Sequence, residues 1–186
     1  MPRAAVYERK LEAFGTITVT PVDPAEDIDL IHDWVSQERA RFWGMADTGR
    51  EGVLEIYEFL DSLPTHHAFL LHRDGVPVGL FQSYQPEHDP ISEYYEVQPG
   101  DVGLHLLIGT PATPPEPGFT DAILRTFIAF LFEDPHAQRI LAEPDARNAQ
   151  AIARLERTGF TLGPEVTLPE KPARLTFLPR ATFETE

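Results

Sequence analysis

One stretch of the chain, residues 101–160, constrains the fold more than any other. It begins with an apolar run from Asp101 to Thr110, passes through a proline-rich turn, and enters an apolar helical pattern at Gly118. A second apolar run and a second helical pattern follow and end at Gly159, a residue typical of a helix C-terminus. The stretch therefore predicts strand, loop, helix, strand and helix. A glycine-containing loop and a helix N-terminus then lie beside a strand end, as in folds that hold a pyrophosphate.

The rest of the chain adds an antiparallel hairpin, predicted by Asp74-Gly75 between two apolar runs. The predicted strands are 14–22, 67–73, 76–84, 103–108, 140–143 and 173–178, and the predicted helices are 23–40, 52–63, 119–132 and 147–157. These elements indicate an α/β fold of mixed α+β character, with a central, mixed, mostly antiparallel twisted sheet flanked by helices. We expect one domain over residues 1–186, with 1–12 as a loosely packed N-terminal extension.

Composition excludes several classes of function. The chain has no cysteine, so disulfides, a thiol nucleophile and Cys-ligated zinc are excluded. The pair His66-His67 has no third ligand at metal spacing, so we expect no metal. A net charge of −15 argues against nucleic acid and favours solubility, and it would attract a cationic amine. No apolar run is long enough for a membrane span and the N-terminus has no signal core, so we expect a cytoplasmic protein without a membrane partner.

Short motifs occur in a fixed order along most of the chain. They are His32-x-Trp34, Arg41-Phe42-Trp43-Gly-Met45, Gly103-x-His105-Leu-Leu-Ile-Gly109, Glu143-Pro-Asp145-x-Arg-Asn148 and Leu168-Pro-Glu-Lys171. With the predicted layout, they resemble the GNAT superfamily of CoA-dependent N-acyltransferases. More narrowly, they resemble the acyltransferases of hydroxamate siderophore biosynthesis, of the aerobactin, mycobactin and desferrioxamine types. The first resemblance implies the GNAT fold.

The resemblance implies acyl-CoA, either acetyl-CoA or succinyl-CoA, as co-substrate, with no metal. In the family, a Gln/Arg-x-x-Gly-x-Gly/Ala loop wraps the CoA pyrophosphate at a helix start. Here Pro115, Gly118 and Thr120 occupy its three defining positions. Many members also carry a tyrosine general acid, and Leu155 stands at that position. The cofactor-binding residues implied by the resemblance are Leu107, Ile108, Gly118, Phe119, Thr120 and Asn148.

His105 and Asp145 are the candidate catalytic residues. His105 lies within an apolar strand, where it is either a core histidine or the base that deprotonates an amine, since histidine titrates near neutral pH. Asp145 follows the next strand and has three open interpretations: a helix N-cap, a carboxylate that orients His105, or a ligand of the substrate amine. The resemblance puts Trp34 and Trp43 near the acceptor substrate, while core packing is the alternative for both.

The reaction implied by the resemblance is acylation of an N-hydroxylated diamine or basic amino acid to a hydroxamate. N-hydroxycadaverine, N6-hydroxylysine and lysine are the acceptors known for such families. The expected partners are therefore the small-molecule amine and acyl-CoA, together with an association with other siderophore pathway enzymes. Two alternatives stay open: acylation of another small amine, such as an antibiotic, and a non-catalytic GNAT-fold binding module.

Overall fold

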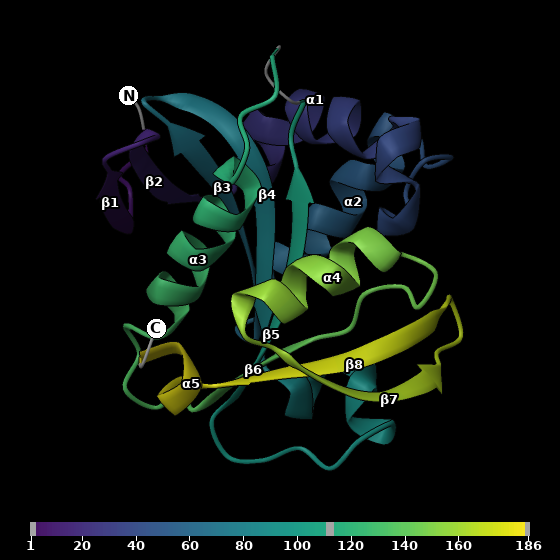
Figure 1. Ribbon diagram of the computed structural model, residues 1–186. Coiled ribbons are helices and arrows are strands. Elements are labelled where there is room, and N and C mark those ends of the chain that lie inside the picture. Colours follow the sequence, from purple (N-terminus) through teal and green to yellow (C-terminus); the bar gives the residue numbers. More distant parts are fainter. Residues whose placement is uncertain (1–2, 111–113, 185–186) are drawn as a thin grey trace. The chain divides into compact units, whose positions relative to one another are not determined.

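The structure is a computed structural model that describes residues 3–110 and 114–184. Its strands form a sheet in the order β1-β2-β3-β4-β5-β6-β8-β7 (Figure 1). The strands are β1 (Tyr7–Leu11), β2 (Gly15–Pro21), β3 (His66–Arg73), β4 (Val76–Tyr84), β5 (Asp101–Ile108), β6 (Arg139–Ala142), β7 (Thr161–Thr167) and β8 (Pro172–Pro179). β5 and β6 pair in parallel, and β1–β2, β2–β3, β6–β8 and β7–β8 pair antiparallel. The predicted mixed, mostly antiparallel sheet is confirmed.

The helices connect these strands. They are α1 (Pro24–Val35), α2 (Arg50–Asp61), α3 (Phe119–Leu131), α4 (Ala149–Thr158) and α5 (Arg180–Glu184), with 3₁₀ helices η1 (Glu38–Trp43), η2 (Pro86–His88) and η3 (Pro90–Glu93). The chain falls into two compact units. Unit 1 comprises Met1–Gln82 and Leu106–Ile123, and unit 2 comprises Ser83–His105 and Leu124–Glu186. The expectation of a single domain over the whole chain stays a prediction.

In unit 1, helices α1 and α2 pack side by side and share an apolar core with β3 and β4. Helix α1 begins where Asp23 accepts hydrogen bonds from the N–H groups of Ala25 and Glu26, with Pro24 at the first helical position. The predicted helix over 23–40 was too long, since α1 ends at Val35 and the chain re-forms as η1. Strand β1 pairs with β2 within the segment expected to be an extension.

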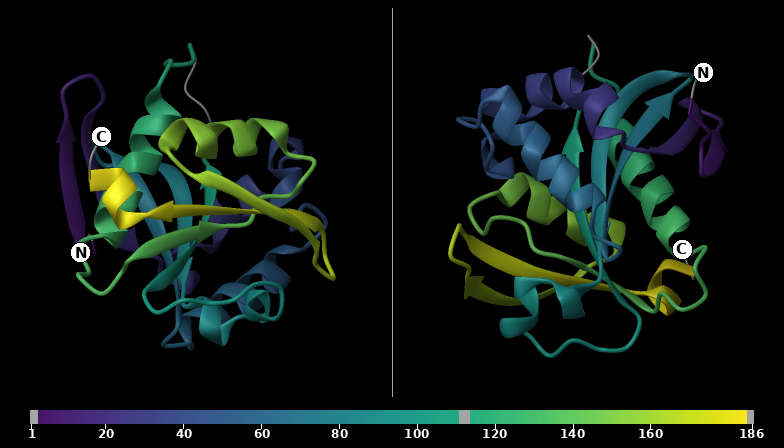
Figure 2. Two further views of the ribbon diagram at one scale, coloured as in Figure 1. Left: turned by 60° about the horizontal axis from the view of Figure 1, so that its bottom comes forward. Right: turned by 180° about the vertical axis from the view of Figure 1, so that it is seen from behind.

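In unit 2, β6, β8 and β7 form one side of the sheet, and the β7–β8 hairpin is seen in Figure 2. Helix α4 begins at Asn148, whose side-chain Oδ1 accepts the N–H of Ala151, and ends at Gly159 with φ of 107°. That backbone conformation favours glycine, as the sequence predicted for this helix end. Strand β7 was not predicted.

A buried ion pair ties the start of β5 to the start of β6. Arg139 donates from Nε and Nη2 to the two oxygens of Asp101, both at 2.7 Å, and Tyr95 donates its hydroxyl to Asp101 at 2.9 Å. The Arg139 guanidinium also lies 4.5 Å from the centre of the Phe177 ring. We refer to Tyr95, Asp101 and Arg139 as the Asp101 cluster.

Candidate active site

The parallel register of β5 and β6 determines which side chains face each other in unit 2. Asp101 pairs with Arg139 and Gly103 pairs with Leu141. The same offset places position 143 beside His105, and the His105 Nε2 contacts the Glu143 Oε1. About a third of the His105 side chain is exposed (34%), whereas that of Glu143 is 7% exposed. An accessible imidazole therefore rests on a carboxylate buried behind it.

Tyr84, the last residue of β4, completes this arrangement. Its hydroxyl donates to the Glu143 Oε2 at 2.7 Å, and its ring centre lies 5.1 Å from that of His105. The ring occupies the space over Gly103, where an added Cβ would lie 2.0 Å from the Tyr84 Cζ. We refer to Tyr84, His105 and Glu143 as the Glu143 cluster.

The pKa shifts in the Glu143 cluster indicate which of its groups are ionised. Burial raises the pKa of Glu143, but the positive charges of His105 and Lys171 and the hydrogen bonds to the carboxylate outweigh it, so the pKa lies below its usual value. Burial, and then the charge of Glu143, raise the pKa of Tyr84 well above its usual value. Glu143 is therefore ionised and accepts from two donors. Since an ionised carboxylate cannot donate, the His105 Nε2 carries the proton that lies between the two groups.

Asp145 has different partners from those considered for it. Its carboxylate accepts from the Arg147 backbone N–H at 2.9 Å, from Nε at 2.9 Å and from Nη2 at 2.7 Å. The hydrogen bonds from Arg147 lower the pKa of Asp145 below its usual value. The carboxylate in contact with His105 is that of Glu143, and the N-cap of α4 is Asn148. The helix-cap interpretation of Asp145 is therefore wrong. The side chain that the Asp145 carboxylate holds in place is that of Arg147.

The strand end in unit 1 contains two of the residues expected to bind the cofactor. Leu107 is buried and its side chain belongs to the unit 1 core, so only its backbone is placed to bind a ligand. The carbonyl of Ile108 accepts a hydrogen bond from the Arg39 Nη1 at 2.5 Å, and the N–H of Gly109 donates to Val78 at 2.8 Å. This backbone is fixed by hydrogen bonds within the unit.

The start of α3 contains three more of the expected cofactor residues, Gly118, Phe119 and Thr120; the sixth, Asn148, is the N-cap of α4. Gly118 has φ of 80°, a conformation that favours glycine, and the Phe119 ring lies 5.5 Å from that of Phe14. The first N–H groups of a helix lack intrahelical acceptors, and the helix dipole favours an anion there. The start of α3 therefore fits a phosphate group. Residues 111–113 of the predicted loop lie outside the described residues.

The two tryptophans expected near the acceptor differ in exposure. Trp34 is 3% exposed, and its ring fills the space over Gly109, where an added Cβ would lie 2.4 Å from the Trp34 Cζ2. This favours the core-packing alternative for Trp34. Trp43 ends η1, is partly buried and packs against the same core. Its binding role stays a prediction.

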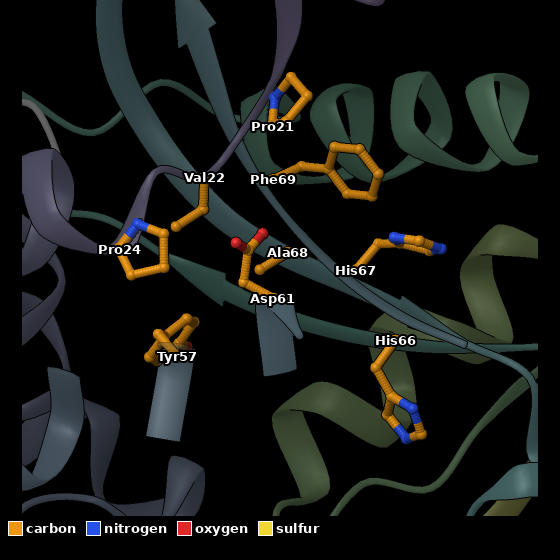
Figure 3. Close-up of a pocket in the computed structure, with 9 residues that line it drawn as sticks. All are labelled: Pro21, Val22, Pro24, Tyr57, Asp61, His66, His67, Ala68 and Phe69. Carbon is orange, nitrogen blue, oxygen red and sulfur yellow. The ribbon is translucent and has the colours of Figure 1, made fainter. Parts of the chain in front are cut away.

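A cavity of about 120 Å³ lies in unit 1 (Figure 3). Its lining is formed by Pro21, Val22, Pro24, Tyr57, Asp61, His66, His67, Ala68 and Phe69. None of the predicted catalytic or binding residues belongs to it. Within residues 3–110 and 114–184, no group of three or more His, Asp or Glu side chains is arranged to hold a metal ion.

Sequence reasoning missed the roles of Glu143 and Tyr84. One signal was available for Glu143. A carboxylate directly after a short apolar strand needs a polar partner if it is buried, and His105 is the basic residue of the neighbouring strand. The register that pairs the two is not readable from the sequence. Tyr84 gave no such signal, because an aromatic residue at a strand end is ordinary in a core.

Comparison with known proteins shows the family to which the chain belongs. The model of the acetyltransferase (GNAT) domain matches residues 23–168. The chain belongs to the GNAT acetyltransferase family. A curated relative, the N(6)-hydroxylysine O-acetyltransferase of Escherichia coli, is 31% identical over 170 residues, which cover 88% of this chain and 52% of that protein. The chain spans about half the length of the first curated relatives it matches.

Two solved structures superpose closely on this one. An uncharacterized protein from Bacillus halodurans has a TM-score of 0.90 at 25% identity, covering 99% of this chain and 95% of that one. The aminoglycoside acetyltransferase AAC(6')-Ib in complex with coenzyme A has a TM-score of 0.80 at 25% identity, covering 91% and 98%. The predicted GNAT fold is confirmed. In the described part of the chain, no helix has the length and apolar character needed to cross a membrane.

Proposed function

We propose that this GNAT protein transfers an acyl group from acyl-CoA to the nitrogen of an N-hydroxylated diamine or basic amino acid. The observation that carries the proposal is the Glu143 cluster, in which a partly exposed histidine rests on a buried, ionised carboxylate. Such a pair is suited to general-base catalysis near neutral pH. Similarity to the E. coli hydroxylysine acetyltransferase supports the substrate class.

In the proposed step, the substrate nitrogen forms the new N–C bond, the thioester C–S bond breaks, and His105 accepts the nitrogen's proton at Nδ1. His105 can then return this proton to the departing sulfur. No tyrosine stands at the family's general-acid position, since Leu155 is buried there, and the Tyr84 hydroxyl is directed to Glu143. Acyl-CoA, as acetyl-CoA or succinyl-CoA, would supply the acyl group and bind through the backbone of Leu107, Ile108 and the start of α3.

The charges around Glu143 and Asp145 favour a neutral nucleophile. Arg147 neutralises Asp145, and the positive charge of Lys171 lowers the pKa of both Asp145 and Glu143. An ammonium group would have to displace Arg147 from Asp145. A hydroxylamine nitrogen is largely neutral at pH 7, whereas an alkylamine has a pKa of about 10.4 and must first lose a proton.

A panel of acyl-CoA donors and amine acceptors tests the proposal, with hydroxamate scored by its ferric colour and free CoA by thiol titration. We expect N-hydroxycadaverine or N6-hydroxylysine to react much faster than cadaverine or lysine. Equal rates for the hydroxylated and parent amines would contradict the proposal. The panel includes an aminoglycoside, because the likeness to AAC(6')-Ib covers 98% of that chain and makes aminoglycoside acetylation the second candidate.

Replacing Gly118 tests the placement of the cofactor. Because Gly118 has φ of 80°, Gly118→Ala should strain the start of α3 by about 1–2 kcal/mol. We expect the KM for acyl-CoA to rise about five- to thirtyfold, while the KM for the amine stays within about twofold. Gly49→Ala is the matched control, since no atom lies within 4 Å of its added Cβ. Equal changes in both KM values would argue against binding at α3.

A further inference from the structure

Three strands contribute to the Glu143 cluster. Tyr84 ends β4, Gly103 and His105 belong to β5, and Glu143 follows β6. The three residues of the cluster and the neighbouring Gly103 all lie in unit 2. Each oxygen of the Glu143 carboxylate has its own partner, since Oε1 contacts the His105 Nε2 and Oε2 accepts the Tyr84 hydroxyl. The carboxylate is therefore held against rotation from both sides.

The difference in burial between Glu143 and His105 separates their roles. The Glu143 side chain is 7% exposed, so it is shielded from a bound substrate, whereas the His105 imidazole is accessible. Glu143 can influence the reaction only through the ring that it holds. A carboxylate that fixes one ring nitrogen as the proton donor leaves the other as the proton acceptor, as in catalytic triads.

We infer that Glu143 is the positioning residue of His105, and that Tyr84 and Gly103 fix Glu143 in place. Glu143 holds the proton on the His105 Nε2 and keeps Nδ1 as the accepting atom. Tyr84 occupies the second oxygen, so the carboxylate cannot turn away from the ring. This inference deepens the proposed function, and only its kinetic consequences rest on that function.

Gly103 also helps to hold Glu143, because it leaves space for the Tyr84 ring. An added Cβ would lie 2.0 Å from the Tyr84 Cζ and 2.2 Å from Cε1, closer than any real contact. The absent side chain makes room for the Tyr84 ring between β5 and the carboxylate. Asp145 cannot replace Glu143 in this role while its two oxygens accept three hydrogen bonds from Arg147.

The variant Glu143→Gln tests the inference with little change in shape. A glutamine amide can donate to Nε2, which moves the ring proton to Nδ1 and removes the accepting lone pair. We expect kcat to fall about 10²–10⁴-fold, as when a general base is removed. In a His105→Ala background, Glu143→Gln should cause no further loss, because the two residues act as a unit. An equal loss in both backgrounds would show that Glu143 acts independently of His105.

Tyr84→Phe removes one donor to Glu143 and keeps the ring. We expect a loss of about tenfold in kcat, on the scale of one hydrogen bond to a charged group. Tyr95→Phe is the matched control, since it removes a tyrosine hydroxyl from the buried carboxylate of Asp101 in the same unit. Tyr95→Phe should lower stability and leave kcat unchanged. Equal losses of kcat in the two variants would overturn the role of Tyr84.

Nitrogen NMR of the His105 ring tests the inference without any substrate. In the neutral ring of the wild-type protein the proton should reside on Nε2, and in Glu143→Gln it should move to Nδ1. A ring with unchanged tautomer in Glu143→Gln would refute the positioning role, whatever reaction the protein catalyses. If no amine in the panel reacts while the tautomer changes, the proposed function fails and the inference stands.

Discussion

The Glu143 cluster and the Asp101 cluster are built from the same parts. Each contains a buried carboxylate, a tyrosine hydroxyl that donates to it, and a basic side chain from the other strand of the parallel β5–β6 pair. The order is reversed between them. In one, β5 supplies the acid Asp101 and β6 the base Arg139; in the other, β5 supplies the base His105 and the acid Glu143 follows β6.

The basic partner makes the difference between the two clusters. Arg139 binds Asp101 through two nitrogens, and the hydrogen bond to Asp101 raises the already high pKa of Arg139. Such a guanidinium holds its proton at every physiological pH. His105 meets Glu143 through one nitrogen of an imidazole, a group that can exchange protons near neutral pH. One cluster is therefore suited to holding strands together and the other to moving protons.

Removing the base from the Glu143 cluster should have the largest effect on activity. We expect His105→Ala to lower kcat per folded molecule about 10²–10⁴-fold, with little change in CoA affinity. Steady-state kinetics and CoA titration measure this. Full activity in His105→Ala would make His105 a core residue, and binding alone would then align a neutral nucleophile.

Removing the base from the Asp101 cluster should affect stability instead. Arg139→Met leaves the buried Asp101 without its cation, and the free energy of unfolding should fall by about 3–5 kcal/mol. Denaturant unfolding measures the change, and kcat per folded molecule should match the wild type. A loss of kcat in the folded variant would show that the Asp101 cluster also contributes to catalysis, which would contradict the proposed difference between the two clusters.

Gly103→Ala should disturb the Glu143 cluster through packing alone. The added methyl would force the Tyr84 ring to move, at a cost of about 1–3 kcal/mol in unfolding free energy. We expect kcat to fall with it, because Glu143 loses its second donor. Gly49→Ala, in open space, is the control. A Gly103→Ala protein with lower stability and full kcat would show that the ring is only a packing element.

Acid should weaken the Glu143 cluster in a defined direction. The folded pKa of Glu143 lies below its unfolded value of about 4.3, so its contribution to stability is complete above that pH. The contribution is lost as the pH falls through the folded pKa. The difference in unfolding free energy between wild type and Glu143→Gln should therefore shrink below about pH 4. A difference that grows with acid would show that Glu143 is protonated in the folded protein.

Helices and strands could be predicted where burial of one face leaves a periodic pattern of apolar residues in the sequence. The Asp74-Gly75 turn predicted the β3–β4 hairpin, and the apolar spacing of residues 119–132 predicted α3. Strands β1 and β7 lie at the two edges of the sheet and are mostly exposed, so they lack the alternation that marks a buried strand. Orienting His105 was one of three interpretations of Asp145, and the structure shows Glu143 in contact with the ring. The sequence could not predict this contact, because the register of β5 and β6 depends on long-range pairing.

The missing side chain at Gly103 also links distant positions in evolution. A descendant with alanine at 103 has no room for the ring at 84, and one that loses the Tyr84 ring no longer needs glycine at 103. The two sites should therefore change together or not at all. Since Glu143 receives its second hydrogen bond from Tyr84, this dependence extends to a third strand. In diverging relatives, these positions should drift as one unit, more slowly than the exposed strands at either edge of the sheet.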